Sequence, residues 1–246
     1  MILRRVMQHV RDQNWFAVGI DFVIVVVGVF IGIQVANWND GRKERAAEQR
    51  YLAELARDLE ADIAELRRGR RHNLARLATS EAILLAVEPA YQRPGFFPLV
   101  GEEPVPNPSF SGYVYAGLTA TFTVVGTDYT FDELVQSGNL GVLSDRALVN
   151  QLAAYYGRIK LRRQEDRVAF EQVAPMLGHL REQGLGLGDP ASVDDAVHRA
   201  REDARFLGMV KTAHFLALWQ YGQLGPLLSE AEATLAAVRA QIEAGR

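Results

Sequence analysis

The chain has 246 residues, of which 48% are hydrophobic and 23% are charged, which is enough for one large domain or two small ones. Its 27 Lys and Arg residues against 30 Asp and Glu residues give a net charge of -3. This balance excludes the strongly basic composition that is typical of proteins that coat nucleic acids. The chain contains no cysteine, so disulfides, cysteine-based metal sites and thiol catalysis are excluded as well.

Residues 16–38 are expected to form a transmembrane helix. The stretch is almost entirely apolar, and Trp15 and Trp38 flank it, as amphipathic rings do at membrane interfaces. At 1.5 Å per residue, about 20 such residues cross a hydrocarbon core of roughly 30 Å. The alternatives are a cleaved signal peptide, for which the stretch is too long, and a buried core helix of a soluble protein. No second stretch of this length follows, so we expect one membrane crossing.

Residues 1–15 form the expected juxtamembrane segment, which is basic and amphipathic. Arg4, Arg5 and Arg11 share one helical face and apolar residues the other, a pattern that binds anionic lipid headgroups. The alternative is a short frayed tail. Lys and Arg are also present beyond the apolar stretch, but the amino side is nearly free of acids. This asymmetry favours a cytoplasmic N-terminus with the C-terminal part on the other side of the membrane.

One face of the apolar helix carries the features of a helix–helix contact. Helical geometry places Asp21, Gly28 and Gly32 close to one line, and the two glycines have the spacing that lets helices approach closely. A carboxylate inside the membrane boundary is costly unless it finds a partner. We therefore expect association through this face, with a second copy or another membrane protein, the alternative being a glycine pair without a partner.

The residues of this segment also carry a resemblance to a known family. Residues 21–40 resemble the opening of a family of uncharacterised bacterial membrane proteins, a domain of unknown function with a short basic tail and one apolar helix. Asp21 stands where that family usually has Glu. The matched positions are Gln34, Asn37, Trp38 and Asn39 at the end of the apolar helix, and Ser137, Gly138, Tyr155 and Tyr156 further on. The resemblance implies a membrane-anchored helical protein and supplies no activity. Together with the orientation favoured by the charges, it leads us to expect a bacterial inner-membrane protein with a periplasmic C-terminal domain.

The remaining chain, residues 42–246, is predicted to form a helical bundle domain. Asn39, Asp40 and Gly41 indicate a helix break before it. Leucines at three- and four-residue steps then predict a long helix up to residue 87. Residues 88–127 form a Pro-rich connection, in which the partial alternation over 109–125 suggests one short β-hairpin.

Capping signals and apolar periodicity predict the helices after this connection. Thr130 and Glu133 have the spacing of a capping box, and Gly138 ends that short helix. Ser144 is expected to cap a long helix, which Pro175 should bend or interrupt.

Two more helices are predicted over residues 189–221 and 226–244, with a break between them at Gly225 and Pro226. The predicted fold class is therefore all-α: an N-terminal transmembrane helix followed by an antiparallel helical bundle.

Arginines crowd two parts of the predicted bundle. The first group lies on the helix after residue 42 and the second on the helix after Ser144; their members include Arg67, Arg68, Arg70, Arg71, Arg162 and Arg163. Groups of like charge that face each other repel unless an anion or an acidic surface lies between them. The arginines are therefore candidates for contact with an anion or a partner, the alternative being a solvated surface with ordinary ion pairs.

The other candidate sites favour structural roles. Asp194, Asp195, His198 and Glu202 lie at steps that could hold a metal, but acidic residues near a helix start also favour the helix dipole. We expect no metal site and no cofactor. The glycines of residues 184–188 lack the ending of a phosphate-binding loop and indicate a connector.

These observations favour a non-enzymatic, membrane-anchored module for interaction or sensing, with lipid and a protein partner but no nucleic acid. The first alternative is an accessory subunit or enzyme with a polar site inside the bundle. A second is a cytoplasmic bundle that binds acidic partners through its arginines, which requires the opposite orientation.

Overall fold

The computed structural model describes residues 15–95, 99 and 103–245 of the chain, and these fold into helices and their connections. The chain divides into two compact units, Met1–Arg50 and Tyr51–Arg246. Apart from Trp15, where the first helix begins, the expected amphipathic segment 1–15 lies outside the described residues.

In the first unit, the described residues belong to helix α2 (Trp15–Val87), which continues into the second unit. The break predicted at residues 39–41 is wrong, because α2 passes through them without interruption. A glycine inside a helix costs only about 1 kcal/mol relative to alanine, and good helix formers follow it here. Arg45 donates to the carbonyl of Gly41 (3.0 Å), and Lys43 pairs with Asp40 (3.1 Å).

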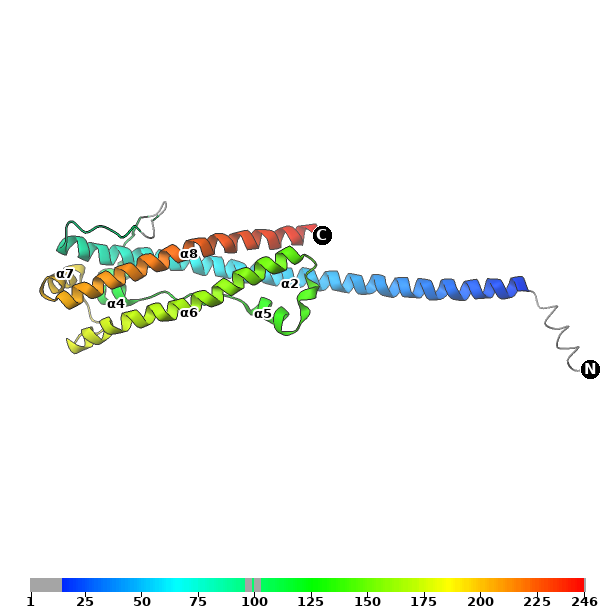
Figure 1. Ribbon diagram of the computed structural model, residues 1–246, viewed down its shortest axis with the longest axis horizontal. Helices are drawn as coiled ribbons and strands as arrows, with labels where there is room; N and C mark the ends of the chain where they lie inside the picture. Colours follow the sequence, from blue (N-terminus) through cyan, green and yellow to red (C-terminus); the bar gives the residue numbers. More distant parts are fainter. Residues whose placement is uncertain (1–14, 96–98, 100–102, 246) are drawn as a thin grey trace, which may run out of the picture. The chain divides into compact units, whose positions relative to one another are not determined.

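The second unit is built on the latter part of α2 and two further long helices, α6 (Arg146–Glu182) and α8 (Ala204–Ala244), which lie side by side (Figure 1). Helix α8 is antiparallel to both of the others, as predicted. Helices α2 and α6 instead run in the same direction (Figure 1), so the expectation of a purely antiparallel bundle is wrong for this pair. The long connection between them carries the chain back to the starting end of the bundle, as any parallel pair requires.

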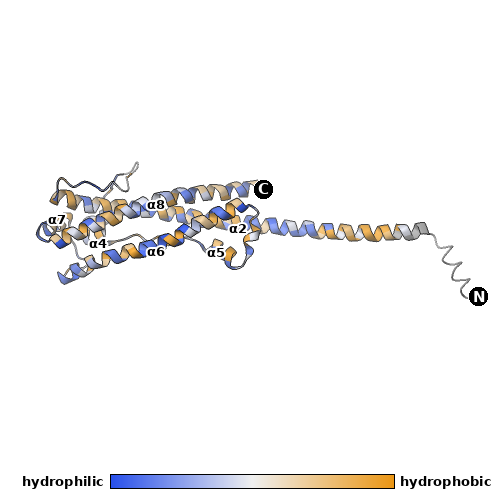
Figure 2. Ribbon diagram, in the orientation of Figure 1, coloured by the Kyte–Doolittle hydropathy of each residue, from blue (hydrophilic) through white to orange (hydrophobic). Residues whose placement is uncertain are grey.

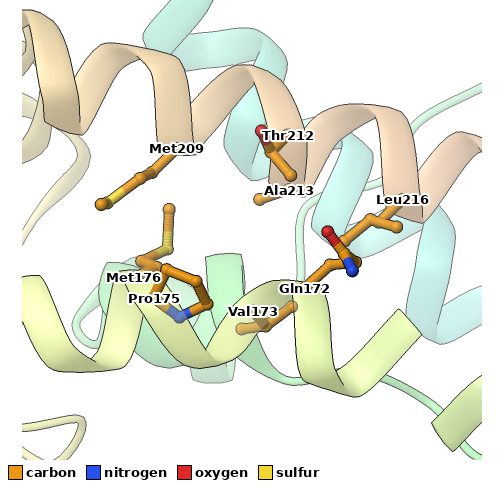
Figure 3. A pocket seen from close by; sticks show the side chains of 8 residues that line it. All are labelled: Gln172, Val173, Pro175, Met176, Met209, Thr212, Ala213 and Leu216. Carbon is orange, nitrogen blue, oxygen red and sulfur yellow. The ribbon is translucent and has the colours of Figure 1, made fainter. Parts of the chain in front are cut away.

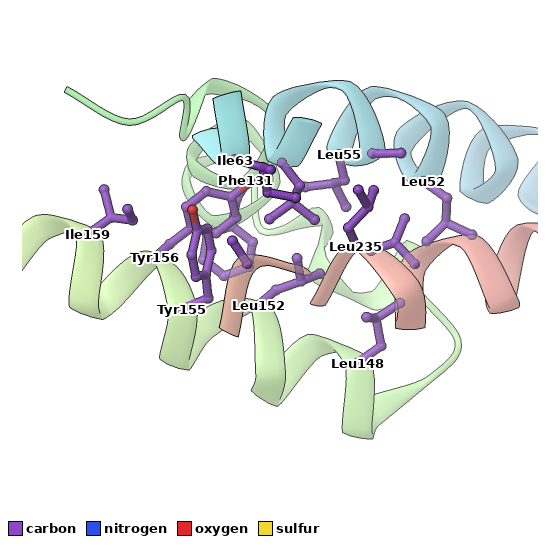
Figure 4. Packing of buried hydrophobic residues seen from close by; sticks show 14 of the residues in the cluster. Leu52, Leu55, Ile63, Phe131, Leu148, Leu152, Tyr155, Tyr156, Ile159 and Leu235 are labelled. Carbon is purple, nitrogen blue, oxygen red and sulfur yellow. The ribbon is translucent and has the colours of Figure 1, made fainter. Parts of the chain in front are cut away.

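Apolar side chains from all three long helices form the main core. Figure 4 shows leucines of α2 and α6 interdigitating with Leu235 of α8. Phe131 of the short helix α5 (Tyr129–Gln136) closes one side of this cluster. A buried aliphatic side chain contributes roughly 1.5–3 kcal/mol, so the leucine pattern read from the sequence is what holds α2 against its neighbours.

The connection after α2 contains short helices where a hairpin was expected. Its elements are α3 (Pro108–Ser111), α4 (Val114–Thr119), α5 and the 3₁₀ helix η1 (Asn139–Val142). Among the described residues, the β pairing is limited to one isolated bridge between Tyr113 and Ala191. The hairpin prediction is wrong because Val114, Tyr115 and Leu118 have helical spacing and are buried together.

Both internal prolines are accommodated inside helices. Pro175 lies within α6 and Pro226 within α8, so Pro175 does not interrupt its helix and the break predicted at Gly225 and Pro226 is wrong. Each proline removes one backbone hydrogen bond, but both occupy exposed positions where water can satisfy the freed carbonyl. The helix predicted over 189–221 is divided, since α7 (Val193–Glu202) ends before Asp203, which caps α8.

The caps at two helix starts also differ from the prediction. Asp145 rather than Ser144 caps α6, and its carboxylate accepts from the backbone amides of Ala147 (2.8 Å) and Leu148 (3.3 Å). Helix α5 begins after Asp128, without a side-chain cap, so the capping box predicted at Thr130 does not form. At the start of α6, the carboxylate of Asp145 binds the free amides that the hydroxyl of Ser144 was expected to bind.

Candidate functional site

An extended segment, residues 120–128, is held inside the second unit by side chains. Three carboxylates bind its backbone amides, and a fourth binds an amide just beyond it. We call these four the carboxylate row: Asp58, Asp62 and Glu65 of α2, and Asp166 of α6. Glu65 accepts from Val125 (3.0 Å) and Gly126 (2.9 Å), Asp62 from Thr127 (2.6 Å), Asp166 from Val124 (2.9 Å), and Asp58 from the nearby Thr130 (3.2 Å). A segment without regular structure needs such partners when it is buried.

The carbonyls of the same segment are bound from other helices. Gln220 of α8 donates to Phe122 (2.9 Å), and His72 of α2 contacts the carbonyl of Ala120 (2.6 Å). Arg163 of α6 donates to the carbonyls of Val125 and Gly126 and pairs with Asp128 (3.0 Å). The segment therefore links all three long helices, and Arg163 is engaged with backbone rather than facing the first arginine group.

The tyrosine pair matched by the family resemblance lies in the main core next to Phe131 (Figure 4), and Tyr155 contacts the carboxylate row. Tyr155 donates its hydroxyl to Asp62 (2.8 Å), while the buried hydroxyl of Tyr156 has no partner among the described residues. The ring of Tyr156 stacks on Phe131 with centroids 5.0 Å apart. Burial raises the pKa of Asp62 and of both tyrosine hydroxyls. This arrangement suits a packing and positioning role for the pair.

A second set of buried polar groups crosses the middle of the bundle. Arg76, which is 1% exposed, donates to Asn73 (3.1 Å) and Gln220 (2.9 Å), and Gln220 donates to Asp166 (3.0 Å). Arg162 forms a buried ion pair with Asp166 and lies 4.6 Å from the ring centroid of Trp219. Burial lowers the pKa of Arg76 to about 10, so its guanidinium stays charged at neutral pH. Arg162 is therefore placed in the interior, away from solvent.

A third polar set contains the residue types of a nucleophilic triad. The hydroxyl of Ser80 lies 3.0 Å from Nδ1 of His214, whose Nε2 is 3.8 Å from Glu81. Ser80 and His214 are 1% and 0% exposed, and Ser80 donates to the carbonyl of Arg76 (2.8 Å). Glu81 is bound at both oxygens by Arg93 (2.5 and 3.0 Å). A nucleophile must reach its substrate, and these groups are closed off by packing.

The first arginine group is divided by its surroundings. Arg67 pairs with Glu232 (2.7 Å), and Arg70 donates to the hydroxyl of Tyr221 (2.7 Å) and lies over its ring. Arg68 and Arg71 are exposed and have no partner among the described residues. They line a cavity of about 440 Å³. Most members of the two arginine groups therefore pair with acids, rings or backbone.

The membrane-helix candidates lie in the first unit. A Cβ atom added at Gly28 or Gly32 would meet nothing within 4 Å, so the unit itself leaves this face open. The side chain of Asp21 lies outside what the structure describes. The family-matched residues Gln34, Asn37, Trp38 and Asn39 are all exposed, and Arg42 stacks 5.4 Å from the ring centroid of Trp38.

Ser137 and Gly138 close helix α5. Ser137 is its C-cap residue, and its hydroxyl donates to the carbonyl of Glu133 (2.7 Å). Gly138 follows with a φ of +71°, the left-handed conformation that favours glycine after a helix. The expected end of the short helix at Gly138 is confirmed.

An acidic residue in the first turn of α7 caps the N-terminus of this helix. Asp195 completes a capping box with Ser192, and these hydrogen bonds lower the pKa of the carboxyl. His198 and Glu202 are 3.4 Å apart on the exposed face. Within the described ranges, no group of three or more His, Cys, Asp and Glu side chains could hold a metal. In the preceding glycine loop, Asp189 accepts from the amide of Gly186 (2.6 Å).

A shallow apolar groove lies between the last turns of α6 and the first turns of α8 (Figure 3). Its volume is about 220 Å³, and Met176 and Met209 face each other across it. Pro175 of α6 is among the residues that line it. Its polar lining is limited to two neutral side chains, Gln172 and Thr212, so it offers no charged group for chemistry.

The carboxylate row is the feature that the sequence interpretation missed. Asp58, Asp62 and Glu65 recur at steps of four and three, which places them on one helix face beside the leucines. Acids that follow an apolar stripe so closely are a signal for buried hydrogen bonding. Asp166, by contrast, carries no such signal in its local sequence.

The family resemblance of residues 21–40 stays a prediction, since the geometry of the matched side chains suits packing and capping in any helical protein. Comparison with known proteins does not bear on it. A scan against protein-family models and searches of curated proteins and of solved structures found no match to this chain.

Proposed function

We propose that the chain is a single-pass, membrane-anchored module that acts by binding or sensing. The observation that carries the proposal is the apolar part of α2, where every described large apolar side chain from Ile20 to Trp38 is at least 44% exposed. Figure 2 shows this run as a continuous hydrophobic stretch. It is the one helix in the described chain that is long and apolar enough to cross a membrane.

A membrane would cover the apolar surface of this stretch, which is otherwise exposed to water. Continuous exposed apolar surface of this extent is rare on soluble monomers and marks contact with lipid or a partner. A helix satisfies its own backbone hydrogen bonds, which is the condition for entering hydrocarbon. The length of residues 16–38 matches the roughly 30 Å core of a bilayer.

The bacterial inner membrane is the proposed location, with the N-terminus in the cytoplasm and the second unit in the periplasm. The support for the location is the resemblance of residues 21–40. The support for the orientation is the basic, acid-poor segment that precedes the apolar stretch. A second copy or another membrane protein would contact the face of Asp21, Gly28 and Gly32.

Binding or sensing is favoured over catalysis by how the polar side chains of the second unit are used. The carboxylate row binds backbone amides, and Ser80 and His214 are closed off by packing. Polar side chains that bind the backbone or are buried in this way stabilise the fold and are not free to bind a substrate. The alternative of a catalytic polar site inside the bundle lacks a support of the same kind.

Alkaline carbonate extraction of membranes that contain the full-length chain tests the anchor. We expect the parent protein to stay in the membrane pellet. A variant with Val26→Arg and Phe30→Arg should be released, because each arginine at the helix centre costs about 2.5–3.5 kcal/mol. The control carries Val168→Arg and Phe170→Arg, which alter similarly exposed apolar side chains (53% and 52%) in the second unit, and it should stay in the pellet.

Extraction of the parent chain by carbonate would overturn the proposal. Orientation is tested separately, with a C-terminal reporter that is active only outside the cytoplasm. A reporter active only in the cytoplasm would contradict the orientation while leaving the anchor intact.

A further inference from the structure

Two neighbouring arginines of α2 face a cavity without a counter-charge. Arg68 and Arg71 line a cavity of about 440 Å³, and neither has a partner among the described residues. Their neighbours on the same helix are all engaged: Arg67 with Glu232, Arg70 with Tyr221, and Arg76 with Gln220. Residues three apart on a helix are close neighbours, and like charges at such spacing destabilise it. The pair therefore costs stability unless something negative lies between the two guanidinium groups.

The rest of the cavity is suited to a ligand. Leu74, Val105 and Pro106 give it apolar walls, and no carboxylate is among its described lining residues. His72 completes the polar side, and its ring is fixed by the contact of Nε2 with the carbonyl of Ala120 (2.6 Å). Phe110 and Phe122 flank this ring, with centroids 5.7 and 5.9 Å away, so the polar group is held in place before any ligand arrives.

We propose that this cavity is a binding site for a small anionic ligand that carries a phosphate or carboxylate group on an apolar body. Guanidinium groups bind the oxygens of such groups in a planar, two-pronged geometry. The volume falls within the range of about 300–1,000 Å³ that is typical of small-molecule sites. The apolar walls account for the body of the ligand, and Arg68 and Arg71 account for its charge.

A lipid headgroup and a free soluble compound share this chemistry. The site belongs entirely to the second unit, Tyr51–Arg246, so it does not depend on how the first unit is anchored. Failure of ligand binding would thus leave membrane retention untouched, and the two proposals can fail separately.

The test is calorimetric titration of the full-length chain, held in nanodiscs of neutral phosphatidylcholine, with phenyl phosphate. We expect saturable binding of one probe per chain. Arg68→Gln and Arg71→Gln should each weaken binding about tenfold or more, because each removes a charged hydrogen-bond donor. Arg57→Gln is the matched control, since Arg57 is another exposed arginine of α2 with no partner among the described residues, and it should bind as the parent does.

Thermal unfolding separates lost binding from lost structure. Without probe, Arg68→Gln should unfold at the same temperature as the parent or higher, because it relieves the repulsion from Arg71. The source of the ligand is read from nanodiscs that contain phosphatidylglycerol: competition with the probe identifies a headgroup, and unchanged binding identifies a soluble compound. Either result supports the site. Binding that does not saturate, or that Arg57→Gln weakens as much as Arg68→Gln, would overturn it.

Discussion

The hydroxyl of Tyr155 donates a hydrogen bond to the carboxylate of Asp62 over 2.8 Å and thereby joins α6 to α2, whereas the adjacent Tyr156 hydroxyl is buried without a partner among the described residues. Neighbouring residues of the same type thus have opposite energetic roles. In Tyr155 the hydroxyl satisfies a buried acceptor, and in Tyr156 the hydroxyl is itself the unsatisfied group.

Replacing each tyrosine by phenylalanine measures this difference. Tyr155→Phe should lower the free energy of unfolding by about 1–3 kcal/mol, because it deprives the buried Asp62 of a donor. Tyr156→Phe keeps the ring stacked on Phe131 and should leave stability unchanged or slightly raised. Urea denaturation of the full-length chain in neutral detergent, followed by circular dichroism, gives both values. Equal losses in the two variants would contradict the assignment.

Stability should fall as the pH is lowered because of His214. Burial lowers its pKa from 6.5 to about 4, and the nearby Glu81 offsets this only in part. Between these values the unfolded chain binds a proton that the folded chain refuses, so folding loses free energy as the pH falls through this window. The loss attributable to His214 at pH 4.5 is about 2–3 kcal/mol.

His214→Asn is the variant that removes this proton site while keeping a side chain that can hydrogen-bond to Ser80. Compared between pH 7 and pH 4.5 by urea denaturation, the parent should lose about 2–3 kcal/mol more than this variant. His198→Asn, at an exposed site, should behave as the parent does. If His214→Asn shows the full acid sensitivity of the parent, another group is responsible.

Alanine substitutions at two glycines with the same backbone conformation distinguish the cost of backbone strain from the cost of a side-chain clash. Gly126 and Gly138 have φ values of +68° and +71°, but a Cβ on Gly126 would lie 2.5 Å from Cγ2 of Ile159, whereas one on Gly138 would meet nothing within 4 Å. Gly138→Ala should cost about 1 kcal/mol, the price of the left-handed conformation. Gly126→Ala should cost a further 1–3 kcal/mol or so, because Ile159 must move. Chemical denaturation of both variants checks this, and similar costs would show that Ile159 adapts freely.

Association through the membrane helix should depend on one face. Gly28→Ile should reduce cross-linking of the full-length chain in mild detergent severalfold, because it blocks close approach of a second helix. Gly19→Ile is the matched control, since residue 19 is half a turn away from residue 28 in helical phase. Asp21→Leu should improve membrane insertion and weaken association. Cross-linking at the parental level in both Gly28→Ile and Asp21→Leu would leave the shared face without a role.

The fold class could be predicted from the sequence, but the chain path could not. The leucines of α2 and α6 have clear helical periodicity, and burial of those leucines is confirmed. The parallel course of α2 and α6 depends on how residues 88–145 return along the bundle, which short-range patterns do not encode. The breaks expected at Gly41 and Pro226 follow local propensities that the helices override.

The candidate site, too, could be predicted from the sequence only in part. Exposed arginines such as Arg68 could be singled out from the sequence, because charge clusters are visible in it. Burial of Arg76 and Arg162 could not, since it depends on residues of α8 that lie far away along the chain: Gln220 for Arg76 and Trp219 for Arg162. The carboxylate row was missed because its partners are backbone amides, and an amide has no residue type to recognise.

The same-direction pairing of α2 with α6 has a consequence for biosynthesis. The hydrogen bond between Asp62 and Tyr155 can form only after Tyr155 has been synthesised, 93 residues after Asp62. At about 5–20 residues per second, this delay is roughly 5–20 s. During this time the leucine face of α2 has emerged from the ribosome without its covering helices. We expect a chaperone to bind this face on the nascent chain and to leave when α8 is complete.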